Sequence, residues 1–239
     1  MATQAKAVAE MDLSLIGSDV VDLLLLAGGG YGGGSGCGGA GGFLTTKIKL
    51  VSGSHTVTIG GSTSNSYFDG PSGAFIAYKG GIGHQNNSNQ ASEFLCGSSG
   101  GGAFHLSQSQ STAGGGASST VAGAMRTFFI GAHLGQGNPG YIQGGSGGGA
   151  GGEGSLNTGG VGRKWIDGTT YAAGGSIFPN SGAGPANSGN GGGTNGHAGG
   201  SGICAIAYVG TTNKFTGGTV SQVGALRIHY FTTSTTFTI

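Results

Sequence analysis

Four carboxylates in this chain could in principle pair as a catalytic acid and base. They are Asp69, Glu93, Glu153 and Asp167. Two carboxyl groups at a suitable separation are sufficient for glycoside hydrolysis. However, Glu153 lies within a run of glycines, and Asp167 begins an Asp-Gly pair that is typical of turns. We therefore interpret both as turn or loop residues and expect that the chain is not an enzyme.

Histidine and cysteine could supply metal ligands, but their spacing does not favour a metal site. The six histidines are His55, His84, His105, His133, His197 and His229. None of them forms an H-x-H or H-x-x-x-H pair, so isolated polar or capping roles are expected. The three cysteines are Cys37, Cys96 and Cys204, which contain no C-x-x-C pair. We expect no metal, and we interpret the cysteines as buried thiols of a protein made in a reducing cytoplasm.

Gly28, Gly30 and Gly33 follow an apolar segment with the spacing of a dinucleotide-binding fingerprint. That fingerprint requires a helix to begin at its glycines, because the amides and dipole of the helix hold the pyrophosphate. The following residues, Gly32 to Gly42, are too rich in glycine to sustain a helix. We therefore expect no cofactor.

Aromatic and amide side chains between the glycine runs are the better candidates for binding. The candidate receptor or partner contacts are Tyr141, Trp165, Tyr171, Phe178 and Asn87. Aromatic side chains in loops suit stacking on sugars or packing on a protein surface. The alternative is that Trp165 and Phe178 fill the ends of the glycine-rich elements, because glycine supplies no side-chain volume.

Composition limits the elements that could position these residues. Glycine provides 60 of the 239 residues, a far higher share than the roughly 7% of ordinary soluble domains. Charged residues are only 7%, and the apolar 36% is clustered in short runs, so we expect order rather than disorder. The formal charge is +1 and the cations are scattered, which predicts no nucleic-acid partner.

The apolar runs predict short strands separated by glycine-rich segments. Strands are expected at residues 20–27, 48–51, 55–59, 128–130, 203–209 and 226–231. Residues 1–16 are rich in helix formers and predict a short N-terminal helix that ends at Gly17 and is either an attachment segment or a frayed end. We take residues 1–19 as this N-terminal segment. We divide the chain into that segment, a glycine-rich core at 20–209 and a C-terminal strand element at 210–239.

Glycine runs recur at residues 28–42, 97–102, 144–154 and 189–202. Neither an α-helix nor a pleated sheet is stabilised by such runs. The extended geometry with three residues per turn, as in polyproline II, can order them if neighbouring segments supply hydrogen-bond partners. The recurrence of the runs therefore suits several extended rods packed side by side.

Three segments together resemble the glycine-rich domain of bacteriophage tail-fibre and virion structural proteins. They read LLLLAGGGYGGGSGCGGAGGF at Leu23 to Phe43, HTVTIGG at His55 to Gly61, and GGTNGHAGGSGICAIAYV at Gly192 to Val209. A fourth segment, HYFTTSTTFTI at His229 to Ile239, resembles the strand pair that accompanies this domain. In the family this element usually precedes the LLLLAGGG strand, so we expect the C-terminal strand to pair beside Val20 to Leu26, either in the same subunit or in a neighbouring one.

The resemblance implies a mostly irregular and β fold, in which packed polyglycine II helices with short flanking β-strands present loops that contact a host surface. The short N-terminal helix is expected beside this core. We therefore expect a virion protein of tail-fibre or fibre-tip adhesin type, made in the host cytoplasm and present as a homo-oligomer. Its expected partners are other virion proteins and a host receptor, either a polysaccharide or an outer-membrane protein. The alternative function is a decoration or capping protein of capsid or tail, without a receptor.

Overall fold

The computed structural model describes residues 20–34, 36–70, 73–83, 136–138, 140–141, 145–177 and 182–239. This part of the chain consists of antiparallel strands and irregular glycine-rich segments, and it contains no helix. The N-terminal helix expected at residues 1–16, the strand expected at 128–130 and the glycine run at 97–102 lie outside the described residues. So do the candidate contacts Asn87 and Phe178. No helix among the described residues is long and apolar enough to cross a membrane.

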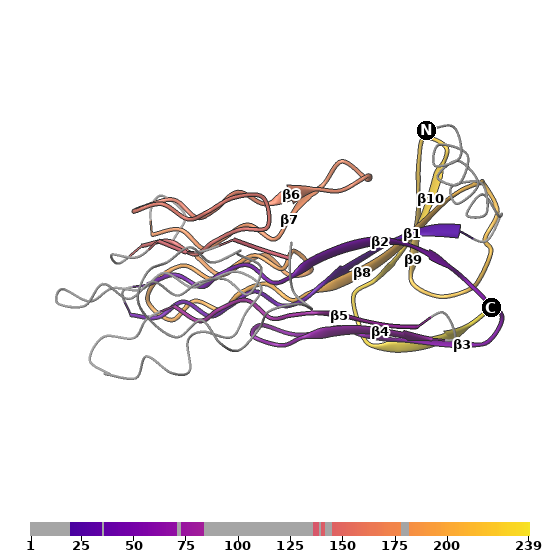
Figure 1. Ribbon diagram of the computed structural model, residues 1–239, viewed down its shortest axis with the longest axis horizontal. Helices are drawn as coiled ribbons and strands as arrows, with labels where there is room; N and C mark the ends of the chain where they lie inside the picture. The colour runs from indigo at the N-terminus through magenta and orange to yellow at the C-terminus, as the bar shows by residue number, and fades with distance from the viewer. Residues whose placement is uncertain are drawn as a thin grey trace, which may run out of the picture.

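A five-stranded antiparallel sheet forms one layer (Figure 1). Its strands, in spatial order, are β2 (Phe43–Lys49), β1 (Val20–Leu26), β8 (Ile203–Val209), β10 (Leu226–Phe231) and β9 (Thr219–Val223). Strand β8 is a continuous apolar run and β1 is apolar except at Asp22, as expected for central strands that are covered on both faces. The expected strands at 20–27, 203–209 and 226–231 are therefore confirmed.

A four-stranded sheet packs against the first to form a sandwich (Figure 1). Its order is β11 (Thr235–Thr238), β3 (Ser54–Thr58), β4 (Ser66–Gly70) and β5 (Gly73–Ala77). Alternate side chains of β3 and β4 are buried, as expected for strands with one face in water. The core between the sheets includes Leu23 and Leu25 of β1, Phe68 of β4 and Phe231 of β10.

The C-terminal strand does not pair beside Val20–Leu26, so that expectation was wrong. Both edges of β1 are occupied, one by β2 and the other by β8. The strand β11 pairs instead with β3, where Phe237 lies opposite His55. The apolar run of β8 is buried on both faces, so β8 suits the central position beside β1. Strand β11 has one buried side chain and therefore suits the edge of a sheet.

Glycine-rich segments extend away from the sheets and lie side by side (Figure 1). Their backbone hydrogen bonds join different segments, and the partner segment repeats at every third residue. In the segment 27–33, the amides of Ala27, Gly30 and Gly33 donate to the carbonyls of Gly42, Gly39 and Gly36. The amides of Gly29 and Gly32 donate to a different segment, at the carbonyls of Gly200 and His197.

The segment 36–42 is surrounded by other segments. The amides of Cys37 and Ala40 donate to Gly145 and Gly148, those of Gly38 and Gly41 to Gly192 and Gly189, and those of Gly39 and Gly42 to Gly81 and Tyr78. Three successive residues thus point to three different neighbours. Since buried backbone groups must be paired, this arrangement satisfies a segment that lies in no sheet.

Each long glycine run that the structure describes reverses direction, which the sequence analysis did not foresee. The run 28–42 goes out and back through a turn closed by a hydrogen bond from the Gly33 amide to the Gly36 carbonyl. A comparable bond from Gly149 to Gly152 reverses the run 144–154. The run 189–202 turns at Asn195 and Gly196, both of which have positive φ. Each of these runs therefore supplies two segments rather than one continuous rod.

His229 is buried in the core between the sheets and is held by two hydrogen bonds. Its Nδ1 lies 2.8 Å from the Gly217 carbonyl oxygen, and its Nε2 lies 3.0 Å from the Tyr208 hydroxyl oxygen. A neutral imidazole matches both, with Nδ1 donating to the carbonyl and Nε2 accepting from the hydroxyl. Burial lowers the pKa of His229 below its ordinary value, and Arg227 lowers it further against the opposing effect of the Gly217 carbonyl.

This burial predicts that the protein loses stability in mild acid. Because the pKa is lower in the folded state, the unfolded chain takes up the proton first as the pH falls through about 6.5. The free energy of unfolding is therefore expected to be highest above that pH and to fall below it. Urea unfolding at pH 7.5 and 5.5 measures the change. The fall should be smaller in His229→Gln, and an equal fall in both proteins would contradict this role.

Candidate binding groove

A short hairpin stands over the five-stranded sheet (Figure 1). It is formed by β6 (Arg163–Lys164) and β7 (Thr170–Tyr171), which pair antiparallel. The connecting turn is closed by a hydrogen bond from the Gly168 amide to the Trp165 carbonyl, and Gly168 has a φ of +85°. Glycine tolerates this conformation without steric cost.

Asp167 connects the hairpin to the sheet. Its Oδ1 accepts from the Thr169 amide at 2.8 Å, which stabilises the turn. Its Oδ2 accepts from the Tyr171 hydroxyl at 2.8 Å and from the Tyr230 hydroxyl of β10 at 3.0 Å. The interpretation of Asp167 as a turn residue is thus confirmed, and the same carboxylate also fixes the hairpin on β10.

The two tyrosines act as hydrogen-bond donors to this carboxylate over the whole physiological pH range. Burial raises the pKa of Tyr171 well above its usual value, and the hydrogen bond to Asp167 raises it further. Burial and the charge of Asp167 raise the pKa of Tyr230 in the same way. Both hydroxyls therefore keep their protons and continue to donate to Asp167, so the hydrogen bonds that hold the hairpin on β10 do not depend on pH in this range.

A groove of about 550 Å³ separates the hairpin from the strands β1 and β2. We call it the hairpin groove. It is lined by Asp22, Leu23, Phe43, Thr45, Thr46, Lys47, Arg163, Lys164, Trp165 and Ile166. It is an open depression on the surface rather than an enclosed cavity.

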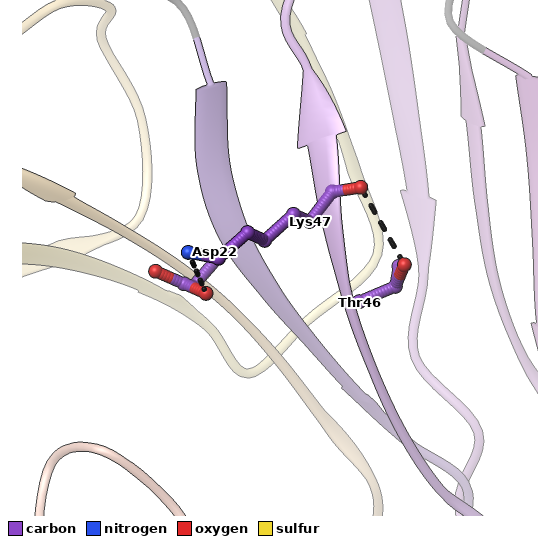
Figure 2. Close-up of polar contacts among 3 residues, drawn as sticks. All are labelled: Asp22, Thr46 and Lys47. Atoms are coloured by element: carbon purple, nitrogen blue, oxygen red, sulfur yellow. Dashed lines mark hydrogen bonds and ion pairs between the residues drawn. The ribbon is translucent and has the colours of Figure 1, made fainter. Parts of the chain in front are cut away.

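Lys47 and Asp22 form an ion pair at the sheet side of the groove. Figure 2 shows the Lys47 side chain reaching from β2 to Asp22 on β1, where Nζ lies 3.0 Å from Oδ1. The two residues are also opposite each other in the register of the strands. The Thr46 hydroxyl donates to the Lys47 carbonyl at 3.4 Å. Because the pair is exposed, it orients the ammonium group but adds little stability.

Arg163 contributes the hairpin side of the groove. Its guanidinium carbon lies 5.4 Å from the centre of the Phe43 ring, which is within the range of a cation–π interaction. The neighbouring Lys164 is exposed and also lines the groove. Three cationic side chains line the groove, Lys47 from β2 and Arg163 and Lys164 from β6, together with the carboxylate of Asp22. This excess of positive charge favours an anionic ligand.

Of the three predicted contact residues that the structure describes, only Trp165 and Tyr171 share a cluster. Trp165 and Tyr171 are buried against the sheet, in one cluster with Leu24 of β1. Tyr141 is 36% exposed. Its amide donates to the carbonyl of Ser146, which lies in the same glycine-rich segment as Ala150 but several residues before it. Ala150 in turn bonds to Ala172, the neighbour of Tyr171. Tyr141 therefore remains the exposed candidate, while Trp165 forms part of the groove wall.

The other candidate chemical groups are dispersed over the described part of the chain. Asp69 lies on β4 and Glu153 in a glycine-rich loop, and both are exposed. His55 and His229 are buried in different sheets, and His197 directly follows the turn at residues 194–196. Among the described residues, no three metal-ligating side chains gather. Cys37 and Cys204 are buried free thiols, as expected, and burial raises the pKa of Cys37 to about 12.

The sequence analysis missed the hairpin groove and the contact between Asp167 and Tyr230. A local signal for the groove existed, because Arg163 and Lys164 stand together beside the single tryptophan in a chain with few charges. The contact from Asp167 to Tyr230 joins residues 63 positions apart, so no local pattern could indicate it.

Comparison with known proteins agrees with the glycine-rich architecture. No curated protein and no solved structure is significantly similar to the chain. Residues 15–209, by contrast, match the family described as the glycine-rich domain. This match covers most of the chain, and it includes the glycine-rich segments and the hairpin. The chain therefore belongs to the glycine-rich domain family.

Proposed function

We propose that the glycine-rich segments are polyglycine II helices packed into a bundle. The repeat of the hydrogen-bond partner at every third residue supports this, because polyglycine II has three residues per turn and no internal hydrogen bonds. Close packing supports it as well. A Cβ atom on Gly147 or Gly191 would lie 1.9 or 2.0 Å from the Gly38 carbonyl oxygen.

We further propose that the chain is a non-enzymatic virion protein of a bacteriophage, of tail-fibre or fibre-tip adhesin type. The observation that carries this proposal is the gathering of turns at the end of the bundle away from the sheets. These turns lie at residues 33–36, 155–158 and 194–197. A rigid scaffold that presents turns at one end is suited to recognition. Tyr141 and Leu156 add exposed apolar surface on that side.

In this proposal the partners are a host polysaccharide or outer-membrane protein at the turns and other virion proteins at the sheets. The protein works as a homo-oligomer within the virion, without nucleic acid or cofactor. One feature favours the alternative of a decoration or capping protein. Val209, Leu226 and Val223 lie opposite one another across three strands, and Val209 is 74% exposed. Such a row suits docking on another virion protein.

Binding of the labelled protein to a panel of bacterial strains tests the adhesin function. We expect saturable binding to the host strain that weakens at least tenfold in a Tyr141→Ala, Leu156→Ser double variant. Val209→Ser serves as the control and should bind like the parent protein. If the folded protein binds no strain but assembles with purified virion components, and Val209→Ser prevents that assembly, the decoration function replaces the adhesin function.

A further inference from the structure

We propose that the hairpin groove binds an acidic polysaccharide through the carboxylate or phosphate groups of its sugar units. This inference rests on the proposed role at a host surface and assigns a second binding position to it. The turns would make contact at one end of the bundle, and the groove would hold an anionic glycan chain beside the sheet.

The charges of the groove carry the argument. Among the described residues, seven side chains are lysine or arginine, and three of them line this one groove. Among the described residues that line the groove, Asp22 is the one carboxylate, and it is engaged by Lys47. The lining is therefore cationic in a protein whose overall formal charge is only +1. Guanidinium and ammonium groups on facing walls are the donors that recognise carboxylate and phosphate.

The walls hold these cations in defined positions. Arg163 lies over the Phe43 ring, and Phe43 is buried in the sheet. The hairpin that carries Arg163 and Lys164 is fixed to β10 by the Asp167–Tyr230 hydrogen bond. Because the groups are positioned before the ligand arrives, little conformational entropy is lost on binding. Thr45 and Thr46 add hydroxyl groups that can pair with sugar hydroxyls.

Burial of the aromatic rings disfavours single-stranded nucleic acid as the ligand of the groove. Proteins that bind single-stranded nucleic acid stack the bases on exposed aromatic faces. In the groove, Phe43 and Trp165 are only 3% and 7% exposed, so neither ring offers a free face. The volume of about 550 Å³ also exceeds what a bare anion needs. A flexible polymer with spaced anionic groups and many hydroxyls fits these features better.

Trp165 provides a direct readout, because it is the only tryptophan in the chain and it lines the groove. The full-length protein would be titrated with polygalacturonate, which carries carboxylates, and with polyglycerol phosphate, while its tryptophan emission is recorded. Neutral dextran and an oligothymidylate are the comparison polymers. We expect a saturable change with one or both acidic polymers and no change with dextran. The affinity should fall as salt is raised.

Two variants and one matched control locate the binding. Lys164→Gln and Arg163→Gln should each raise the Kd at least fivefold, with unchanged far-ultraviolet circular dichroism. Lys214→Gln removes the same charge from an exposed side chain that lies over the Tyr208 ring, outside the groove. It should change the Kd less than twofold. Equal weakening in all three variants, equal binding of the oligothymidylate, or no binding of either acidic polymer would overturn the proposal.

The two proposals fail in different ways. If the groove variants lose the acidic polymer but still bind host cells as the parent does, the groove has no role in host binding and this inference is wrong as stated. If the polymer binds in the groove but the protein binds no strain, the adhesin function fails while the glycan site remains.

Discussion

Replacing Gly38 by alanine is expected to lower the melting temperature by about 6–12 °C. Gly38 lies in the segment 36–42, which is surrounded by other segments. A Cβ atom there would lie 2.0 Å from the Gly30 carbonyl oxygen and 2.5 Å from its carbon. Both atoms belong to the backbone, so no side-chain rotation relieves the clash. Overpacking of this kind costs about 3 kcal/mol, which corresponds to the stated shift for a domain of this size.

The matched control is Gly61→Ala. Nothing lies within 4 Å of a Cβ atom at Gly61, and the residue is exposed. The same chemical change there reduces the entropy of the unfolded chain without a clash, so stability should rise slightly, by about 0.5 kcal/mol. Thermal unfolding followed by circular dichroism measures both variants. If Gly38→Ala were as stable as Gly61→Ala, close packing of the glycine-rich segments would not be what stabilises the bundle.

Three strands of the five-stranded sheet, β1, β8 and β10, could be predicted from the sequence, whereas β9 was not expected and the strand expected at 48–51 overlaps only the end of β2. Segments such as Val20–Leu26 and Ile203–Val209 contain more apolar residues than a strand with one exposed face would carry. The presence of strands there and their burial could therefore both be predicted. Their pairing could not. Antiparallel partners are chosen by long-range packing, and the assignment of the C-terminal strand to the edge of β1 failed because β8 already occupies that edge.

The positions at which the glycine runs reverse could not be predicted from the sequence, for a different reason. Turns are usually recognised by a change of composition, such as Asn-Gly between apolar residues. The turn at Gly33 to Gly36 has the same composition as the segments it joins, so its position carries no local signal. For the candidate site, the sequence indicated which residues were unusual, as with Trp165. It could not indicate that Trp165 would be buried against the sheet, because that depends on Asp167 meeting Tyr230.

Replacing Phe237 by alanine is expected to destabilise the protein by about 3–5 kcal/mol, although the residue is only two positions from the end of the chain. Phe237 is the buried side chain of β11. Its ring centre lies 5.0 Å from that of Phe215, 5.2 Å from that of Phe231 and 5.2 Å from the His55 ring. Because Phe231 belongs to the five-stranded sheet and His55 to the other, Phe237 contacts both layers of the sandwich.

Urea unfolding of Phe237→Ala and Thr238→Ala tests whether the last strand belongs to the core. Thr238 is exposed on the same strand, so its truncation should change the free energy of unfolding by less than about 0.5 kcal/mol. A large loss of unfolding free energy in Phe237→Ala alone would show that β11 unfolds together with the rest of the sandwich. If β11 frayed separately, a cavity in it would not lower the stability of the other strands. Equally small losses in both variants would mean that the sandwich is stable without its C-terminal strand. The contact of Phe237 with both sheets predicts the first result.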